Sequence, residues 1–131
     1  MIIAKPQRRK RVQRELGPHK AIAAFLDCAL PEEYRYTHVP NGGARDARTG
    51  AMLKAMGVKA GVPDMVVFGP GSWCGLLEIK PANGGALSPS QKAWAEWAGQ
   101  NSVCYAVVRS VGDVQVALND WRIPLRAEVA A

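Results

Sequence analysis

Residues 61–80, GVPDMVVFGPGSWCGLLEIK, constrain the fold of this 131-residue chain more than any other stretch. Two runs rich in apolar residues flank the turn residues GPGS, a pattern that predicts a β-hairpin. Charges are costly to bury, yet Asp64 opens the first strand and Glu78 and Lys80 close the second. A hairpin that folds symmetrically about Gly71 places Asp64 opposite Glu78, with Cβ atoms about 5 Å apart. The sequence therefore predicts that three charged side chains meet at one end of a sheet.

The rest of the chain predicts helices and strands around this hairpin. The predicted helices cover residues 16–30, 44–57, 88–99 and part of 110–121, and the predicted strands cover 34–39, 64–68, 73–79 and 103–108. Pro18 fits only the first turn of the first helix, because proline has no N–H to donate. The order α, β, α, β, β, α, β, α predicts one α/β domain.

The positive charge of the chain belongs to its first residues. The formal net charge is +6, and residues 1–14 hold six basic residues and no acidic one. The remaining basic and acidic residues balance. We predict a flexible arm over residues 1–15 that contacts nucleic acid phosphates, and a solubilising tail is the alternative. The residues expected to make these contacts are Arg8, Arg9, Lys10 and Arg11.

The hydropathy of the chain indicates its compartment. No apolar run approaches the roughly 18–20 residues that span a bilayer, and the basic start MIIAKPQRRKRVQR is not followed by the apolar stretch of a secretory signal. We therefore expect a soluble, cytoplasmic protein with no membrane partner.

The charges at the end of the hairpin suit metal-assisted hydrolysis. Asp64 and Glu78 repel each other unless a cation lies between them. Their hard oxygen ligands favour Mg²⁺, which activates water and polarises a phosphoryl oxygen. Lys80 could orient or deprotonate the attacking water, or neutralise charge on the phosphate. An ordinary lysine–carboxylate pair at a sheet edge is the alternative interpretation.

These motifs resemble those of a known family of nucleases. GVPD followed by LEIK matches the PD-(D/E)xK signature, which here reads Pro63-Asp64 and Glu78-Ile79-Lys80. PNGG, KAMGVKAGVPD and SPSQ occur in the same order as in the VRR-NUC family of virus-type replication–repair nucleases. The resemblance runs from about residue 18 to 125, and the chain is similar to the single-domain, phage-type members.

The resemblance implies both a fold and an activity. The fold is a restriction-endonuclease-like α/β core over residues 16–125, with a mixed central sheet flanked by helices and a tail at 126–131. The activity is Mg²⁺- or Mn²⁺-dependent, structure-selective cleavage of branched or four-way-junction DNA, by a homodimer that acts in replication, repair or recombination. A phage-encoded member would work in the cytoplasm of its bacterial host. A non-catalytic DNA-binding subunit that guides another enzyme is the alternative, and RNA remains open as a substrate.

The resemblance also implies roles for single residues. Asp64, Glu78 and the backbone carbonyl of Ile79 are expected to bind the metal, and Lys80 is the expected catalytic lysine. Gln91 is expected beside this lysine as part of the catalytic site. The segment SPSQ is equally a capping box that needs no function.

The first helix and the PNGG loop are expected at the same site. Family members place a Glu and a Gln on the first helix, and this chain has Glu15 and His19 near those positions. Either residue could reach the metal, whereas a histidine at a helix start is more often on the surface. The expected DNA contacts are Asn41, Arg45, Arg48, Lys54 and Lys59. Turn chemistry for the asparagine and a solvated helix face for the others are the alternatives.

Overall fold

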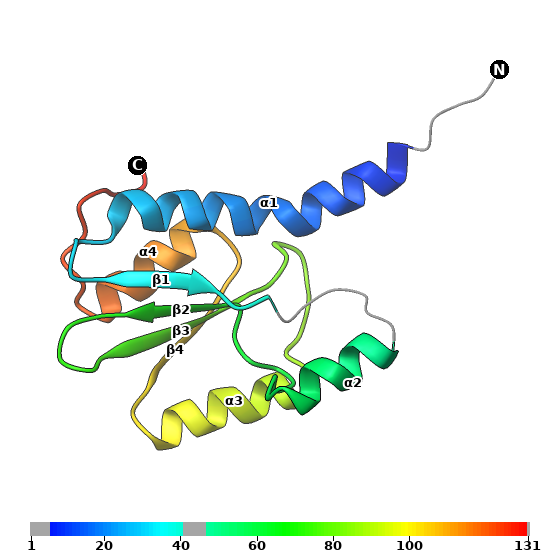
Figure 1. The fold of residues 1–131 in the computed structure, drawn as a ribbon. Coiled ribbons are helices and arrows are strands. Elements are labelled where there is room, and N and C mark those ends of the chain that lie inside the picture. The colour runs from blue at the N-terminus through cyan, green and yellow to red at the C-terminus, as the bar shows by residue number, and fades with distance from the viewer. Residues whose placement is uncertain (1–5, 41–46, 131) are drawn as a thin grey trace.

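The structure is a computed structural model that describes residues 6–40 and 47–130, with the backbone alone for residues 6–17. The described residues form four helices and four strands (Figure 1). The helices are α1 (Pro6–Ala29), α2 (Ala47–Ala55), α3 (Pro89–Gln100) and α4 (Val111–Asp120). The strands are β1 (Arg35–His38), β2 (Met65–Phe68), β3 (Cys74–Ile79) and β4 (Cys104–Val108). The predicted order of elements is confirmed.

The four strands form one mixed sheet in the order β1-β2-β3-β4. The first three strands are antiparallel neighbours, and β4 pairs in parallel with β3. A parallel pair needs a crossover connection, and α3 supplies it between β3 and β4. The predicted mixed central sheet flanked by helices is therefore confirmed.

The register of the β2–β3 hairpin has the symmetry predicted from the sequence. Met65 pairs with Leu77 and Phe68 with Cys74, so the hairpin is centred on Gly71. Gly71 has φ +69, a left-handed conformation that glycine adopts without steric penalty. By this register, Asp64, the residue before β2, faces Glu78.

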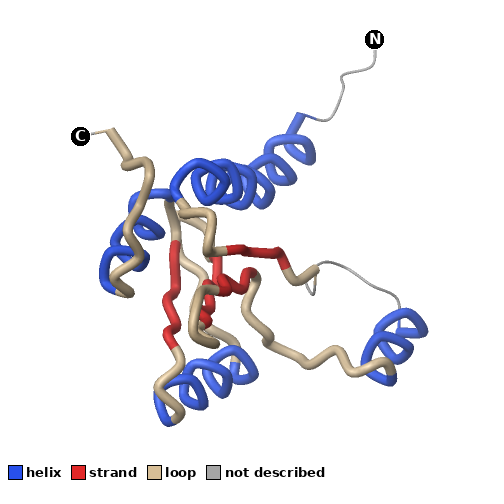
Figure 2. Tube along the Cα trace, turned by 60° about the vertical axis from the view of Figure 1, so that its left-hand side comes forward, coloured by secondary structure: helices blue, strands red, loops and turns tan. Residues whose placement is uncertain are grey.

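The main core lies between the sheet and the pair of helices α1 and α4. Alternate strand residues face this layer, because side chains along a strand point to opposite faces in turn. The cluster comprises Ile22, Leu26, Leu30, Met65, Val67, Leu77, Val108, Val114, Ala117, Leu118 and Ile123. Figure 2 shows α1 and α4 on one side of the strands and α3 on the other.

The second face of the sheet carries the side chain of Glu78 toward α3. The loop before Asp64 packs on the first turns of that helix. Trp94 Nε1 donates a 3.0 Å hydrogen bond to the carbonyl of Ala60, and a Cβ on Gly61 would lie 2.5 Å from the backbone of Ser90. This docking brings the start of β2 and the start of α3 together. By contrast, α2 stands apart from the sheet, and none of its residues is buried (Figure 2).

Helix α1 differs from its predicted boundary. It begins at Pro6 rather than near residue 16, so much of the predicted flexible arm has a helical backbone that extends beyond the sheet (Figure 1). Pro18 lies inside this helix and not in its first turn. The segment before it is rich in Arg, Lys and Gln, which are good helix formers, and Pro6 fits the first helical position. Across 24 residues these preferences outweigh the loss of one N–H donor at Pro18.

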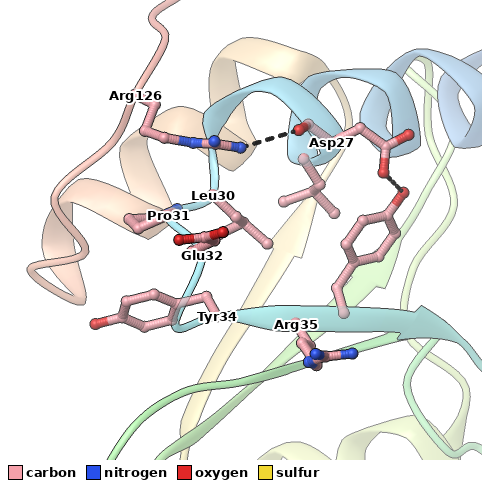
Figure 3. A pocket seen from close by; sticks show the side chains of 9 residues that line it. Asp27, Leu30, Pro31, Glu32, Tyr34, Arg35 and Arg126 are labelled. Carbon is pink, nitrogen blue, oxygen red and sulfur yellow. Dashed lines mark hydrogen bonds between the residues drawn. The ribbon is translucent and has the colours of Figure 1, made fainter.

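The C-terminal tail packs against α1. The backbone N–H of Arg126 donates a 2.8 Å hydrogen bond to the carbonyl of Ala29, which satisfies one carbonyl at the end of the helix. Arg126 also points toward Asp27 across a shallow pocket of about 330 Å³ (Figure 3). Tyr36 donates a 2.7 Å hydrogen bond to the Asp27 carboxylate, and burial together with this contact raises the pKa of Tyr36 to about 12. Within the described ranges, no helix is long and apolar enough to cross a membrane.

Candidate active site

Asp64 is held at the start of β2 by contacts to its carboxylate and to its backbone. The backbone N–H of Ile79 donates a 2.7 Å hydrogen bond to Asp64 Oδ2. The Asp64 carbonyl accepts a 2.7 Å bond from the N–H of Val39 and contacts His38 Nδ1 at 2.8 Å. The carboxylate is therefore tied to β3 and the peptide to the end of β1.

Glu78 is a buried carboxylate near the end of β3. The residue is 2% exposed, and its Oε1 accepts a 2.7 Å hydrogen bond from Gln91 Nε2. Lys80 Nζ lies 3.8 Å from the same oxygen. Glu78 Oε2 is buried and has no hydrogen-bond partner among the described residues. A buried carboxylate oxygen in this state can still bind a cation.

Burial raises the pKa of Glu78 to about 7, and the negative charge of Asp64 adds to this rise. The ammonium of Lys80 opposes it in part. The two carboxylates therefore repel each other. This repulsion favours the protonated form of Glu78, the more buried of the two.

Gln91 joins the two charged ends of this cluster. Lys80 Nζ donates a 2.7 Å hydrogen bond to Gln91 Oε1, while Gln91 Nε2 donates to Glu78. The predicted capping box at Ser88 is also present, with both of its hydrogen bonds. Gln91 Oε1 also accepts a 2.9 Å hydrogen bond from the backbone N–H of Ser88. Gln91 therefore makes its capping contacts and its contacts to Lys80 and Glu78 at the same time.

Comparison with solved structures relates this architecture to a known fold. No family model matches the sequence, and no curated protein matches it. A solved structure described as a VRR_NUC domain protein matches with a TM-score of 0.57 and 21% sequence identity, over 78% of this chain and 84% of that one. This chain shares the fold of that protein. The resemblance noted in the sequence is thus confirmed at the level of fold.

His19 of α1 reaches this end of the sheet. His19 Nε2 lies 3.8 Å from Asp64 Oδ1, and the ring is roughly a quarter exposed. Burial lowers the pKa of His19 and the neighbouring His38 lowers it further, whereas Asp64 partly opposes the shift. The imidazole is therefore predominantly neutral at pH 7. A residue of the first helix therefore lies beside Asp64.

Two residues near the site were not identified from the sequence. His38 contacts the Asp64 carbonyl, and Tyr105 on β4 has a buried hydroxyl with no hydrogen-bond partner in the described part of the chain. Burial raises the pKa of Tyr105 to about 12, with contributions from the charges of Glu78 and then Asp64. In the sequence, both look like ordinary strand residues. Only the pairing of their strands with β2 and β3 reveals their position.

Of the remaining predicted site residues, Ile79 contacts this cluster through its backbone. Arg48, Lys54 and Lys59 are exposed on or just after α2. For Ile79 the described contact to Asp64 uses its N–H rather than its carbonyl. Asn41 and Arg45 lie outside the described residues, as do the side chains of Arg8, Arg9, Lys10, Arg11 and Glu15.

The donor set at this site suits a hard cation that keeps other ligands. Among the described residues, no three His, Cys, Asp or Glu side chains gather into a metal-binding group. Mg²⁺ does not require one, because it usually binds one or two carboxylates together with waters and substrate phosphates. Asp64 and Glu78, with the unpartnered Oε2 of Glu78, therefore fit Mg²⁺ or Mn²⁺ better than a cation that needs only protein ligands.

Proposed function

We propose that this protein is a Mg²⁺- or Mn²⁺-dependent endonuclease that hydrolyses phosphodiester bonds in DNA. The observation that carries the proposal is the convergence of Asp64, Glu78, Lys80 and Gln91 at one end of the β2–β3 hairpin. A protein that only binds DNA has no need to bury Glu78 beside a second carboxylate, which is unfavourable without a cation.

Asp64 and Glu78 would hold the metal, and the chemistry it supplies when bound is polarisation of the phosphoryl oxygen and activation of water. Neutralisation of both carboxylates would also remove their mutual repulsion. The carbonyl of Ile79 is proposed as a further ligand. Among the remaining donors, His19 on α1 has its Nε2 3.8 Å from Asp64 Oδ1.

Lys80 is proposed as the catalytic lysine. Its side chain is 14% exposed and its ammonium is held by Gln91, so it has a fixed position at the edge of the site. From there it would orient the attacking water and neutralise charge that develops on the scissile phosphate. Gln91 would hold Lys80 and Glu78 in fixed positions relative to each other, because one amide group contacts both.

Affinity for DNA is proposed to come from phosphate contacts rather than from base contacts. The basic residues before Pro18, which include Arg8, Arg9, Lys10 and Arg11, supply the excess charge of the chain. Arg48, Lys54 and Lys59, together with Asn41 and Arg45, would add contacts from α2 and from the residues on either side of it in the sequence. Such contacts read the path of the backbone and favour selection of branched DNA by shape.

The same proposal includes action as a homodimer on four-way junctions. The enzyme would act during replication, repair or recombination in the cytoplasm. Symmetric cleavage of a junction requires two active sites, which two copies of this chain would provide. Sedimentation equilibrium at micromolar concentration tests this part, and a monomer bound to an intact junction would contradict it.

The deciding experiment is cleavage of labelled single-stranded, duplex, flap and four-way-junction DNA, with an RNA duplex alongside, in Mg²⁺ or Mn²⁺. Wild type, Lys80→Ala and the control Lys92→Ala are compared; Lys92 is an exposed lysine on α3. We expect cleavage by wild type and by the control, abolition by EDTA, and a loss of at least about 100-fold in Lys80→Ala. Tight binding without cleavage in either metal would instead favour the DNA-binding subunit.

A further inference from the structure

His38 makes a contact that strand pairing alone does not require. The Asp64 carbonyl already accepts a 2.7 Å hydrogen bond from the N–H of Val39, which continues the β1–β2 ladder. His38 Nδ1 lies 2.8 Å from the same oxygen. A carbonyl oxygen only accepts hydrogen bonds, so Nδ1 must carry the hydrogen in this contact. The side chain of His38 is therefore fixed as a second donor to the Asp64 peptide.

The ring of His38 also contacts His19. The two ring centroids are 4.8 Å apart at an interplanar angle of 79°, which is an edge-to-face arrangement. His19 in turn places Nε2 3.8 Å from Asp64 Oδ1. Two imidazoles, one from β1 and one from α1, thus lie against Asp64, one at its backbone and one at its carboxylate.

The position of Asp64 explains why this support matters. Asp64 follows the Gly-Val-Pro loop and precedes β2, so it stands where the regular ladder begins. Its Oδ2 is fixed by the N–H of Ile79, whereas Oδ1 faces His19. A rotation of the Asp64 peptide would move both carboxylate oxygens away from Glu78.

We propose that His38 is a positioning residue for the metal site: its imidazole holds the Asp64 peptide, and with it the Asp64 carboxylate, in place for a divalent cation. This inference rests on the proposed metal site. It does not make His38 a metal ligand. Partners that orient a metal ligand in this way typically change metal affinity about 10- to 100-fold when they are removed.

The test measures metal binding without DNA and without turnover. Mn²⁺ is titrated into the full chain, and free Mn²⁺ is measured by electron paramagnetic resonance. The variants are His38→Ala, His38→Asn and His38→Gln, with Thr37→Val as an exposed strand control. In Asn the amide nitrogen is the same number of bonds from Cα as Nδ1 is in histidine. In Gln the amide nitrogen is one bond further from Cα. Thermal unfolding without metal is recorded for each variant.

We expect His38→Ala and His38→Gln to weaken Mn²⁺ binding at least about tenfold, and His38→Asn and Thr37→Val to stay within about threefold of wild type. Equal affinity in all variants would overturn the role of His38 while leaving the metal site in place. The role would also be overturned if Asn and Gln weakened binding alike, or if binding fell only in step with the unfolding temperature. A wild type that binds no Mn²⁺ would overturn the proposed function itself and this inference with it.

Discussion

Gln91 Nε2 donates a 2.7 Å hydrogen bond to Glu78 Oε1, and Oε1 of the same amide accepts a 2.7 Å bond from Lys80 Nζ. A single side chain in the first turn of α3 thereby links the buried carboxylate of β3 to the ammonium that follows it. The same residue closes the capping box with Ser88. The start of the helix and the geometry of the site thus both depend on one glutamine, and mutation of Ser88 and of Gln91 itself separates the two contributions.

Ser88→Ala and Gln91→Ala should have different effects on cleavage. Ser88→Ala removes the Oγ that accepts from the N–H of Gln91 at 3.2 Å, so it should lower the free energy of unfolding by about 1 kcal/mol. Cleavage should stay within about threefold of wild type, because the contacts of Gln91 to Lys80 and Glu78 remain. Gln91→Ala also removes the amide that contacts both Lys80 and Glu78, and it should lower cleavage at least about tenfold. Urea unfolding and single-turnover cleavage measure the two effects, and an equal loss of cleavage in both variants would make Gln91 a capping residue only.

The buried carboxylate predicts how stability changes with pH. The pKa of Glu78 is raised from 4.5 to about 7 in the folded protein, so the folded state binds its proton more tightly than the unfolded state. The stabilisation is complete below about pH 4.5 and is lost as the pH rises to about 7, by up to about 3 kcal/mol at about 1.4 kcal/mol per pKa unit. Glu78→Gln does not titrate at this position. As the pH rises across this range, wild type should therefore lose unfolding free energy relative to Glu78→Gln. Urea denaturation of both proteins measures this difference.

Metal should reverse the loss of stability at high pH. Deprotonated Glu78 is the form that binds a cation, so about 10 mM Mg²⁺ should raise the unfolding temperature of wild type at about pH 8 and have little effect at about pH 5. Thermal unfolding with and without Mg²⁺ at both pH values measures this. Glu78→Gln serves as the control, and an equal response of that variant to Mg²⁺ would place the cation elsewhere.

Gly61→Ala should be strongly destabilising. Gly61 has φ +75, and a Cβ there would lie 2.5 Å from the carbonyl carbon of Ser90 and 2.7 Å from the backbone nitrogen of Gln91. Strain and the clash together should lower the free energy of unfolding by about 2–4 kcal/mol. Gly99→Ala is the matched control, because nothing lies within 4 Å of its Cβ position in α3, and it should stabilise by about 0.5–1 kcal/mol. Chemical denaturation compares the two, and a Gly61→Ala variant as stable as wild type would contradict the docking of this loop on α3.

The basic segment of α1 should control the salt dependence of DNA binding. Replacing Arg8, Arg9, Lys10 and Arg11 by Gln removes four charges while it keeps good helix formers. The slope of log affinity against log salt should become shallower by up to about 0.9 for each phosphate that the variant no longer neutralises. Binding titrations between about 50 and 200 mM salt measure this slope. Lys20→Gln is the single-charge control on the same helix, and an unchanged slope in the fourfold variant would exclude these residues as DNA contacts.

Features that depend on neighbours along the chain could be predicted before the structure was known. The order of elements, the turn at Gly71 and the opposition of Asp64 and Glu78 follow from short-range patterns, because strand alternation and a tight turn together define the register of a hairpin. The capping box at Ser88 is equally local. For the same reason, the charged end of the hairpin can be recognised in the sequence alone.

The residues that surround that end depend on how distant elements pack together. His38 meets Asp64 because β1 pairs with β2, and Tyr105 lies near Glu78 because β4 pairs in parallel with β3. The path of α1 brings His19 to the carboxylate of Asp64. Periodicity within a strand or helix does not encode which distant element it packs against, because that choice depends on how all the apolar faces are buried at once. In the same way, the helix preferences of many residues together continue α1 through Pro18, although this proline taken alone predicts the start of a helix.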